Sequence, residues 1–175
     1  MTIDTSIEFV SINIVVITIS DTRTVKNDTS GDTLEKRIID AGHQMIKRII
    51  IPDDVNQIKE TLQTISKDKK VDCIITTGGT GLTGRDTTPE AVKEIANKHI
   101  DGFGELFRQV SFDKIGTSAI QSRAVAALIN STYVFCLPGS TGACKDGWDE
   151  ILKYQLDIRH KPCNFVEIMP RLNEK

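Results

Sequence analysis

Two hydrophobic patterns alternate along this chain. Short runs that are almost continuously apolar, as buried parallel strands are, cover residues 9–20, 44–51, 71–75 and 132–137. Between and after them, apolar residues recur every three or four positions, around residues 34–41, 55–65, 92–99 and 148–156. Strands that alternate with helices predict an α/β protein with a three-layer α/β/α fold, in which helices flank both faces of a mostly parallel sheet.

The remaining segments have weaker patterns. We expect one helix from Asp101 through Val110 and another that carries Ile120, Ala124 and Leu128. Residues 165–169 are interpreted as a short strand or an extended cover, and residues 1–8 as a polar lead-in that is frayed or used in subunit contacts. No linker or repeat interrupts the chain, so residues 9–175 are expected to form a single domain.

Cap residues place the ends of the first two helices. Ser30 or Asp32 can begin the first helix, and Gly42 can end it. Either Asp53 or Asp54 can cap the second helix. Capping is therefore a sufficient structural reason for an aspartate at position 53, and it competes with any functional reason.

A glycine-rich loop lies between the strand at residues 71–75 and the helix that Pro89 begins. Its four glycines are Gly78, Gly79, Gly81 and Gly84. Glycines let a backbone turn sharply and bring its N–H groups close to a ligand, and a helix N-terminus adds partial positive charge that suits a phosphate. The Asp86 carboxylate is unfavourable beside an anion unless a metal ion or a proton offsets it. The structural alternative is a tight turn with an ordinary cap at residue 87 or 88.

Two nucleotide-binding motifs fit this loop poorly. Gly79-x-Gly81-x-x-Gly84 matches the dinucleotide fingerprint, but the next acidic residues, Asp101 and Glu105, lie in a predicted helix rather than at the end of a strand. No Gly-Lys-Ser/Thr follows, so the loop is not a Walker A element. A nicotinamide-linked oxidoreductase is accordingly the third of three functional hypotheses, and absence of NAD binding would remove it.

Three loops follow three of the predicted strands. They are Ser20-Asp21, the segment from Gly78 to Asp86, and the segment from Pro138 to Gly142. Because the carboxyl ends of parallel strands meet at one edge of a sheet, these loops can converge into a site. Ser20 and Asp21 could line this site, or their side chains could instead fold back onto amides of their own loop. Arg85 and Arg123 could offset negative charge there. The residues by themselves indicate an enzyme that handles phosphates or nucleotides.

Composition excludes several classes of protein. The 175 residues include 22 Lys and Arg and 24 Asp and Glu, a net charge of −2 without long runs of one sign, so neither nucleic acid nor membrane binding is expected. No apolar stretch has transmembrane length, and residues 12–19 lack a basic leader, so the expected location is the cytoplasm. The cysteines lack metal-site spacing; Cys73 and Cys136 are expected to be buried, and Cys144 and Cys163 near loops could be exposed.

Several separated motifs, in order, resemble one known family. They are Gly78-Gly79-Thr80-Gly81, Arg85-Asp86-x-Thr88-Pro89-Glu90, Gly102-Phe103-Gly104-Glu105 and Leu137-Pro138-Gly139. The chain resembles the molybdopterin-binding family of molybdenum cofactor biosynthesis, which includes the bacterial MoaB and MogA proteins and the G domain of gephyrin. The similarity runs from about Ile12 to Asn164. The segments at residues 20–24, 28–31 and 136–144 resemble the MoaB branch in particular.

The resemblance implies an activity and an assembly. Family members associate as trimers or hexamers, and some adenylylate molybdopterin with Mg-ATP and release pyrophosphate. By position, Asp53 and Asp86 would be the catalytic residues and could hold Mg²⁺. Ligand contacts would come from the glycine loop, at Gly78, Gly79, Thr80 and Gly81, and on the pterin side from Ser122, Pro138, Gly139 and Ser140. Other proteins of cofactor biosynthesis are implied as partners.

One departure leaves a second hypothesis open. Many adenylyltransferase members continue Pro-Gly-x-Pro after the corresponding strand, whereas this chain has Pro138-Gly139-Ser140-Thr141-Gly142. Some members of the MoaB branch resemble working enzymes and others only bind the pterin. The alternative is therefore a non-catalytic molybdopterin-binding or assembly protein of the same pathway.

Overall fold

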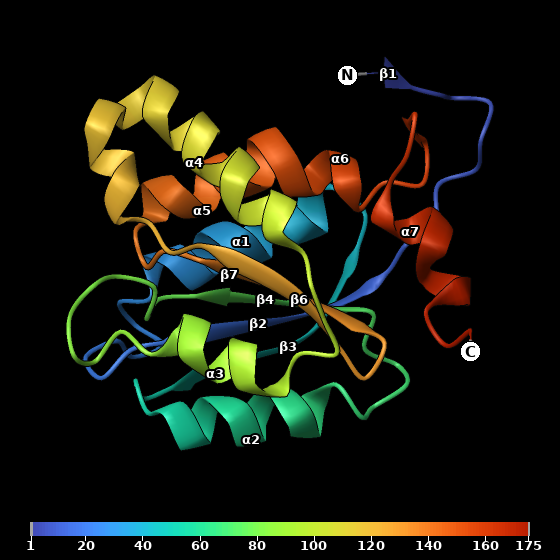
Figure 1. Ribbon diagram of the computed structural model, residues 1–175. Coiled ribbons are helices and arrows are strands. Elements are labelled where there is room, and N and C mark those ends of the chain that lie inside the picture. Colours follow the sequence, from blue (N-terminus) through green and yellow to red (C-terminus); the bar gives the residue numbers. More distant parts are fainter. Residues whose placement is uncertain (1, 175) are drawn as a thin grey trace.

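The computed structural model describes residues 2–174, in which a mixed six-stranded sheet has the strand order β3-β2-β4-β7-β6-β5 (Figure 1). The strands are β2 (Asn13–Ile19), β3 (Gln44–Ile51), β4 (Cys73–Thr77), β5 (Lys98–His99), β6 (Val125–Ile129) and β7 (Thr132–Leu137). Strands β3, β2, β4 and β7 are parallel, whereas β6 pairs antiparallel with both β7 and β5. This arrangement confirms the predicted α/β fold.

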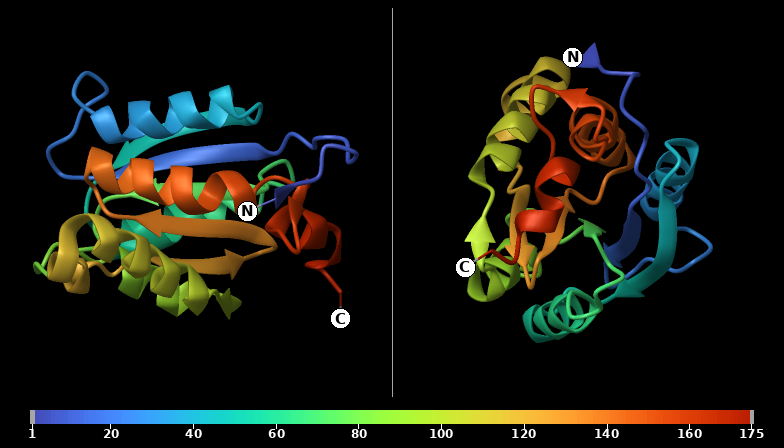
Figure 2. Two further views of the ribbon diagram at one scale, coloured as in Figure 1. Left: turned by 90° about the horizontal axis from the view of Figure 1, so that it is seen from above. Right: turned by 90° about the vertical axis from the view of Figure 1, so that its right-hand side faces the viewer.

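Helices cover both faces of the sheet, as Figures 1 and 2 show. On one face lie α2 (Val55–Ile65) and α3 (Thr88–Ile95). On the other lie α1 (Thr29–Asp40), α4 (Asp101–Ile115) and α5 (Thr141–Gly147), which continues through a π-helical turn (Trp148–Leu152) into α6 (Lys153–Gln155). Successive side chains of β2 point to opposite faces of the sheet, so Ile14 packs with α1 while Val15 packs with α2 and α3.

The predicted strands at residues 44–51 and 132–137 are confirmed. The first strand begins at Asn13 rather than Phe9, because the Phe9 ring leaves the sheet and packs against His43 and the Arg159 guanidinium. The strand expected at residues 71–75 lies at Cys73–Thr77, and its last two residues are buried threonines.

The helix predicted around residues 120–128 is wrong. Residues 116–121 form a 3₁₀ turn, and the alanine-rich segment after it is strand β6. Asn130 and Ser131 both have positive φ, of 49° and 71°, which lets a two-residue turn join β6 to β7 as a hairpin. Periodicity failed here because β6 is buried for most of its length and so lacks strand-like alternation.

Two more boundaries differ from the prediction. The helix expected to reach His99 ends at Ile95, because the Asn97 N–H donates to Leu128 O and draws the chain into the sheet as β5. The segment near residue 165 is helix α7 (Phe165–Ile168), not a strand, and the Asn164 side chain caps it by accepting from the Glu167 N–H.

The helix caps show which aspartates have a structural role. Asp28, not Ser30 or Asp32, caps α1 by accepting from the Gly31 N–H. Gly42 follows α1 with φ of +88°, as predicted. At α2 the cap is Asp54, whose carboxylate accepts from the amides of residues 56 and 57. Asp53 therefore has no capping role, and the structural explanation for it is removed.

The start of the described chain pairs with a short strand of its C-terminal segment. β1 (Thr2–Ile3) pairs antiparallel with β8 (His160–Lys161), so the start of the lead-in is paired rather than frayed. Cys73 and Cys136 are buried as predicted, and Cys163 is exposed. Cys144 is also buried, contrary to expectation, because it packs under the loop after β7 with its Sγ 3.1 Å from Thr77 Oγ1. Within residues 2–174, no helix is long and apolar enough to cross a membrane.

Candidate functional site

The loops after β2, β4 and β7 converge at one edge of the sheet, away from β1 and α7 (Figure 1). Arg85 of the glycine loop makes a bidentate ion pair with Asp21, at 3.0 and 2.9 Å. The backbone N–H of Asp53 donates to the same Asp21 carboxylate at 3.1 Å. Gly139 of the loop after β7 lies against Gly78 of the glycine loop, so the predicted convergence of the three loops is confirmed.

A cavity of about 550 Å³ opens where these loops meet the helices. Nine of the predicted residues line it: Gly78, Gly79, Thr80, Gly81, Asp86, Ser122, Pro138, Gly139 and Ser140. The other three predicted residues do not line it: Ser20, Asp21 and Asp53. Of these, Asp21 and Asp53 lie beside the glycine loop, since Asp21 pairs with Arg85 and Asp53 approaches Gly79.

Sequence reasoning missed one wall of the cavity. The missed residues are Ile19, Phe107, Ser111, Ile115, Gln121, Ala143 and Asp146. Most of them come from α4, α5 and the turn after α4. Ser111 could have indicated this wall, because it is a small polar residue on the otherwise apolar inward face of α4, where it is 6% exposed.

Two glycines of the loop are required by geometry. Gly78 has φ of +108°, and a Cβ there would lie 2.1 Å from Ile19 O. Gly79 has φ of +64°, and a Cβ there would lie 2.9 Å from Asp53 Oδ1. Within residues 2–174, the N–H groups of Gly79 and Thr80 donate no hydrogen bond. The loop thus presents backbone donors that are not used within the described residues, close to the Asp53 carboxylate.

Arg123 organises the loop from behind. Its Nε donates to Gly81 O at 2.7 Å, and a terminal nitrogen donates to Asp86 O at 2.6 Å. The other terminal nitrogen pairs with Glu90. Because the guanidinium is committed to two loop carbonyls and a carboxylate, it fixes the backbone of the loop.

The Asp86 carboxylate is held in an ionised state at the cavity wall. It accepts from the Thr83 N–H at 2.9 Å and from Thr83 Oγ1 at 2.6 Å. Burial by itself would raise the pKa of Asp86, but these hydrogen bonds outweigh burial and lower it below its usual value. Asp86 therefore carries its negative charge at neutral pH.

Asp53 has the opposite environment. Its Oδ1 is buried and has no hydrogen-bond partner among the described residues. Burial, followed by the negative charges of Asp21 and Asp86, raises the pKa of the Asp53 carboxyl. A buried carboxylate oxygen without a donor calls for a cation or a proton.

We expect Asp53→Asn to stabilise the protein in the absence of ligands. Its raised pKa means that ionised Asp53 opposes folding, a penalty absent below the unfolded carboxyl pKa and complete above the folded one. Because solvent screens this half-buried group, the gain at neutral pH is on the order of 1 kcal/mol, or about 2–4 °C in Tm. Thermal unfolding at pH 7 and pH 3.5 measures it, and a gain that does not shrink at the lower pH would contradict the explanation.

The second loop of the cavity is fixed by α1 and β4. Ser30 Oγ donates to Gly139 O at 2.9 Å, and Thr77 Oγ1 donates to Pro138 O at 3.0 Å. Ser140 caps α5 by accepting from the Ala143 N–H at 3.2 Å. A Cβ at Gly139 would lie 3.3 Å from Gly78 Cα, so the two glycine-containing loops are in direct contact.

The family model described as "Probable molybdopterin binding domain" matches residues 15–158, a range that includes all three loops. The chain belongs to this molybdopterin-binding family. The family assignment inferred from the separated motifs is thereby confirmed.

Relatives and solved structures of the family cover nearly the whole chain. "Molybdenum cofactor biosynthesis protein B" of Escherichia coli (strain K12) is 41% identical over 160 residues, which are 91% of this chain and 94% of the relative. A crystal structure of a protein with that name has a TM-score of 0.84 at 36% identity and covers 94% of this chain and 98% of its own. The "tungsten cofactor synthesizing protein MoaB" of Pyrococcus furiosus has a TM-score of 0.73 at 32% identity, covering 81% and 91%. The chain is thus a MoaB-type member of the family.

Proposed function

We propose that this MoaB-type domain acts in molybdenum cofactor biosynthesis, where it binds molybdopterin and adenylylates it with Mg-ATP. The observation that carries the proposal is that a buried carboxylate oxygen without a donor lies beside a loop whose backbone N–H groups have no acceptor. Among residues 2–174, the buried Oδ1 of Asp53 has no donor, and the N–H groups of Gly79, which lies beside Asp53, and of the next residue, Thr80, have no acceptor. A metal-bound polyphosphate supplies the cation for the first and the oxygens for the second.

The residues present fit Mg²⁺ of this kind. No group of three or more His, Cys, Asp or Glu side chains in residues 2–174 is gathered closely enough to hold a metal ion by itself. Mg²⁺ is commonly held by one or two carboxylates and completes its shell with phosphates and water. Asp53 and Asp86 would supply those carboxylates, and the bound ion would neutralise charge on the reacting phosphates.

The proposed reaction is an adenylyl transfer, a displacement at the α-phosphorus of ATP. An oxygen of the pterin's terminal phosphate forms a bond to the α-phosphorus of ATP, the bond from that phosphorus to the bridging oxygen breaks, and pyrophosphate leaves. The Gly79 and Thr80 N–H groups would hold the charge that develops on the α-phosphate, because donors fixed in place need no reorganisation. Arg123 would keep those donors positioned through the Gly81 and Asp86 carbonyls.

A specific observation favours the second candidate, a pterin-binding protein without catalysis. The second loop is Pro138-Gly139-Ser140-Thr141-Gly142 and has no proline where Pro-Gly-x-Pro enzymes carry one. Its Thr141 instead lies 3.0 Å from Thr29 through the two hydroxyls, so this wall is built differently. Asp53, which the fold does not need as a cap, favours the enzyme.

Pyrophosphate release by the purified full chain with Mg-ATP and molybdopterin tests the proposal. We expect release that requires the pterin and equals the adenylylated pterin formed. Pterin binding without release would contradict adenylylation and leave the binding protein. Binding of neither ligand would contradict both candidates and leave a resemblance of fold.

A further inference from the structure

The cavity has two chemically different ends. The loops after β4 and β7 offer backbone amides and glycines, as described above. The opposite end lies between α4 and α5, which pack against each other, and its walls include the apolar side chains of Phe107, Ile115 and Ala143. Apolar walls of this kind suit a flat heterocycle rather than a phosphate.

Two polar groups interrupt these apolar walls, Ser111 of α4 and Asp146 of α5. Asp146 lies six residues beyond the Ser140 cap, which places it about 9 Å along the helix axis from Ser140 in the loop after β7. A two-ring heterocycle that carries a short phosphorylated side chain spans such a distance. Asp146 is therefore at the end where the ring would lie if the phosphate lay at the loops.

The Asp146 carboxylate forms one ion pair and can still accept further hydrogen bonds. Lys114 Nζ lies 3.0 Å from Oδ1, and the Asp146 side chain is 22% exposed. Within residues 2–174, the polar contact of this carboxylate is made through Oδ1, and Oδ2 accepts no hydrogen bond. Since each carboxylate oxygen has two acceptor sites, both oxygens can still receive donors from a ligand. The ion pair with Lys114 also limits rotation of the Asp146 side chain.

We propose that Asp146 is the specificity-determining residue that receives the 2-amino and ring N–H donors of a pterin. The inference rests on the proposed pterin substrate. This edge of a pterin presents two parallel N–H groups, whose spacing matches the two oxygens of one carboxylate, and charge-assisted pairs of this type are strong. A lumazine has an oxygen in place of the 2-amino group and would set an acceptor against the carboxylate. The Ser111 hydroxyl can bond to another polar atom of the ring.

A binding experiment without turnover tests this assignment. Pterin fluorescence follows the titration of the full chain with 6-hydroxymethylpterin phosphate and with the corresponding lumazine phosphate. We expect the wild type to prefer the pterin, and Asp146→Asn to weaken pterin binding about tenfold with no loss for the lumazine. Asp146→Ser, which removes the charge with a smaller side chain, should give the same change in preference.

Glu150→Gln is the matched control. Glu150 approaches the same Lys114, at 3.7 Å, but does not line the cavity, so the preference should be unchanged. Equal weakening of both compounds by Asp146→Asn, or an unchanged preference, would overturn the assignment and leave the proposed function standing. Failure of the wild type to bind either compound would overturn the assignment together with the pterin part of the proposed function.

Discussion

Asp86→Asn is expected to lower the rate of pterin-dependent pyrophosphate release at least about a hundredfold, equivalent to about 2.7 kcal/mol of barrier. The carboxylate lines the cavity, and hydrogen bonds from Thr83 keep it ionised at neutral pH. Asparagine retains one side-chain oxygen, so it can still accept from the Thr83 N–H and preserve the loop. The substitution therefore removes the charge and leaves the shape, and the loss should appear in turnover rather than in folding.

Asp54→Asn provides the control for this experiment. Asp54, which follows Asp53 in the chain, caps α2 and does not line the cavity, and asparagine caps a helix as well as aspartate does. Its rate should stay within about twofold of the wild type. Wild-type turnover in Asp86→Asn would contradict the role assigned to this carboxylate, and the thermal unfolding midpoint of each variant separates loss of activity from loss of structure.

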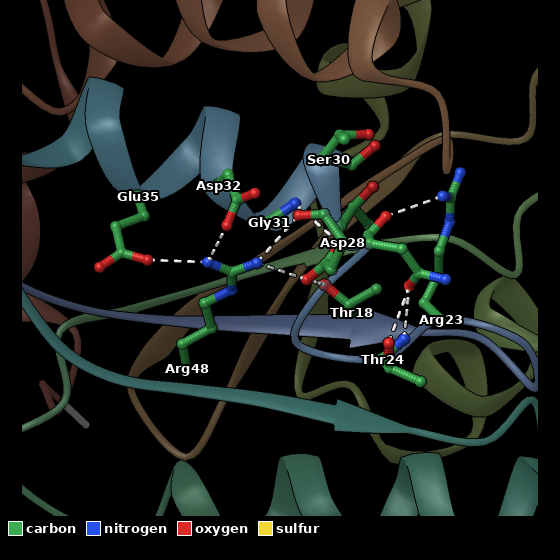
Figure 3. A network of polar contacts seen from close by, with 12 residues as sticks. Thr18, Arg23, Thr24, Asp28, Ser30, Gly31, Asp32, Glu35 and Arg48 are labelled. Carbon is green, nitrogen blue, oxygen red and sulfur yellow. Dashed lines mark hydrogen bonds and ion pairs between the residues drawn. The ribbon is translucent and has the colours of Figure 1, made fainter.

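Asp28→Ala is expected to lower the free energy of unfolding by about 3–5 kcal/mol. The Asp28 side chain is 1% exposed and accepts from Arg48 at 2.8 Å, from Thr18 Oγ1 at 2.7 Å and from the Gly31 N–H at 3.0 Å (Figure 3). Alanine would remove the innermost carboxylate partner of the partly buried Arg48 guanidinium, which would keep only Asp32 and Glu35, and would also remove the cap of α1. Denaturant unfolding at neutral pH measures the loss.

Asp32→Ala separates the buried contact from the exposed one. Asp32 pairs with the same Arg48 (Figure 3), at 2.6 Å. Its side chain is 61% exposed, so its removal should cost less than about 1 kcal/mol. Equal losses in the two variants would show that burial does not decide the effect.

The pH dependence of Asp28→Ala follows from the direction of the pKa shift. Burial would raise the pKa of Asp28, but the hydrogen bonds from Arg48, Thr18 and Gly31 outweigh burial and lower it. The stability from a lowered carboxyl pKa is present above about pH 4 and is lost as the pH falls through the folded value. The difference between wild type and Asp28→Ala should therefore shrink in acid.

The same network connects α1 to the cavity. Asp28 fixes the start of α1, where Ser30 holds Gly139 O and Thr29 contacts Thr141. A loosened α1 would release the wall formed by the second glycine-containing loop. Sequence reasoning treated Asp28 only as part of a family motif, because its partner Arg48 is on another strand and its burial depends on the assembled sheet.

The sequence by itself determined the α/β fold, the family and the three loops of the site. Buried parallel strands are continuous apolar runs, so strands such as Gln44–Ile51 were visible locally. Parallel strands that alternate with helices bring the loops at their carboxyl ends to one edge, so the meeting of Asp21, Gly78 and Gly139 followed from chain order.

Only the tertiary structure decided the rest. Ala124 to Leu128 has small apolar residues compatible with a helix, and pairing with β7 through the Asn130-Ser131 turn made it a strand. The choice of cap at α2 fell on Asp54 and left Asp53 with an unpaired oxygen, which no spacing rule distinguishes. Asp146 and Ser111 joined the cavity because α4 packs against α5. These outcomes depend on contacts between residues far apart in the chain, where the free energy of packing overrides local preference.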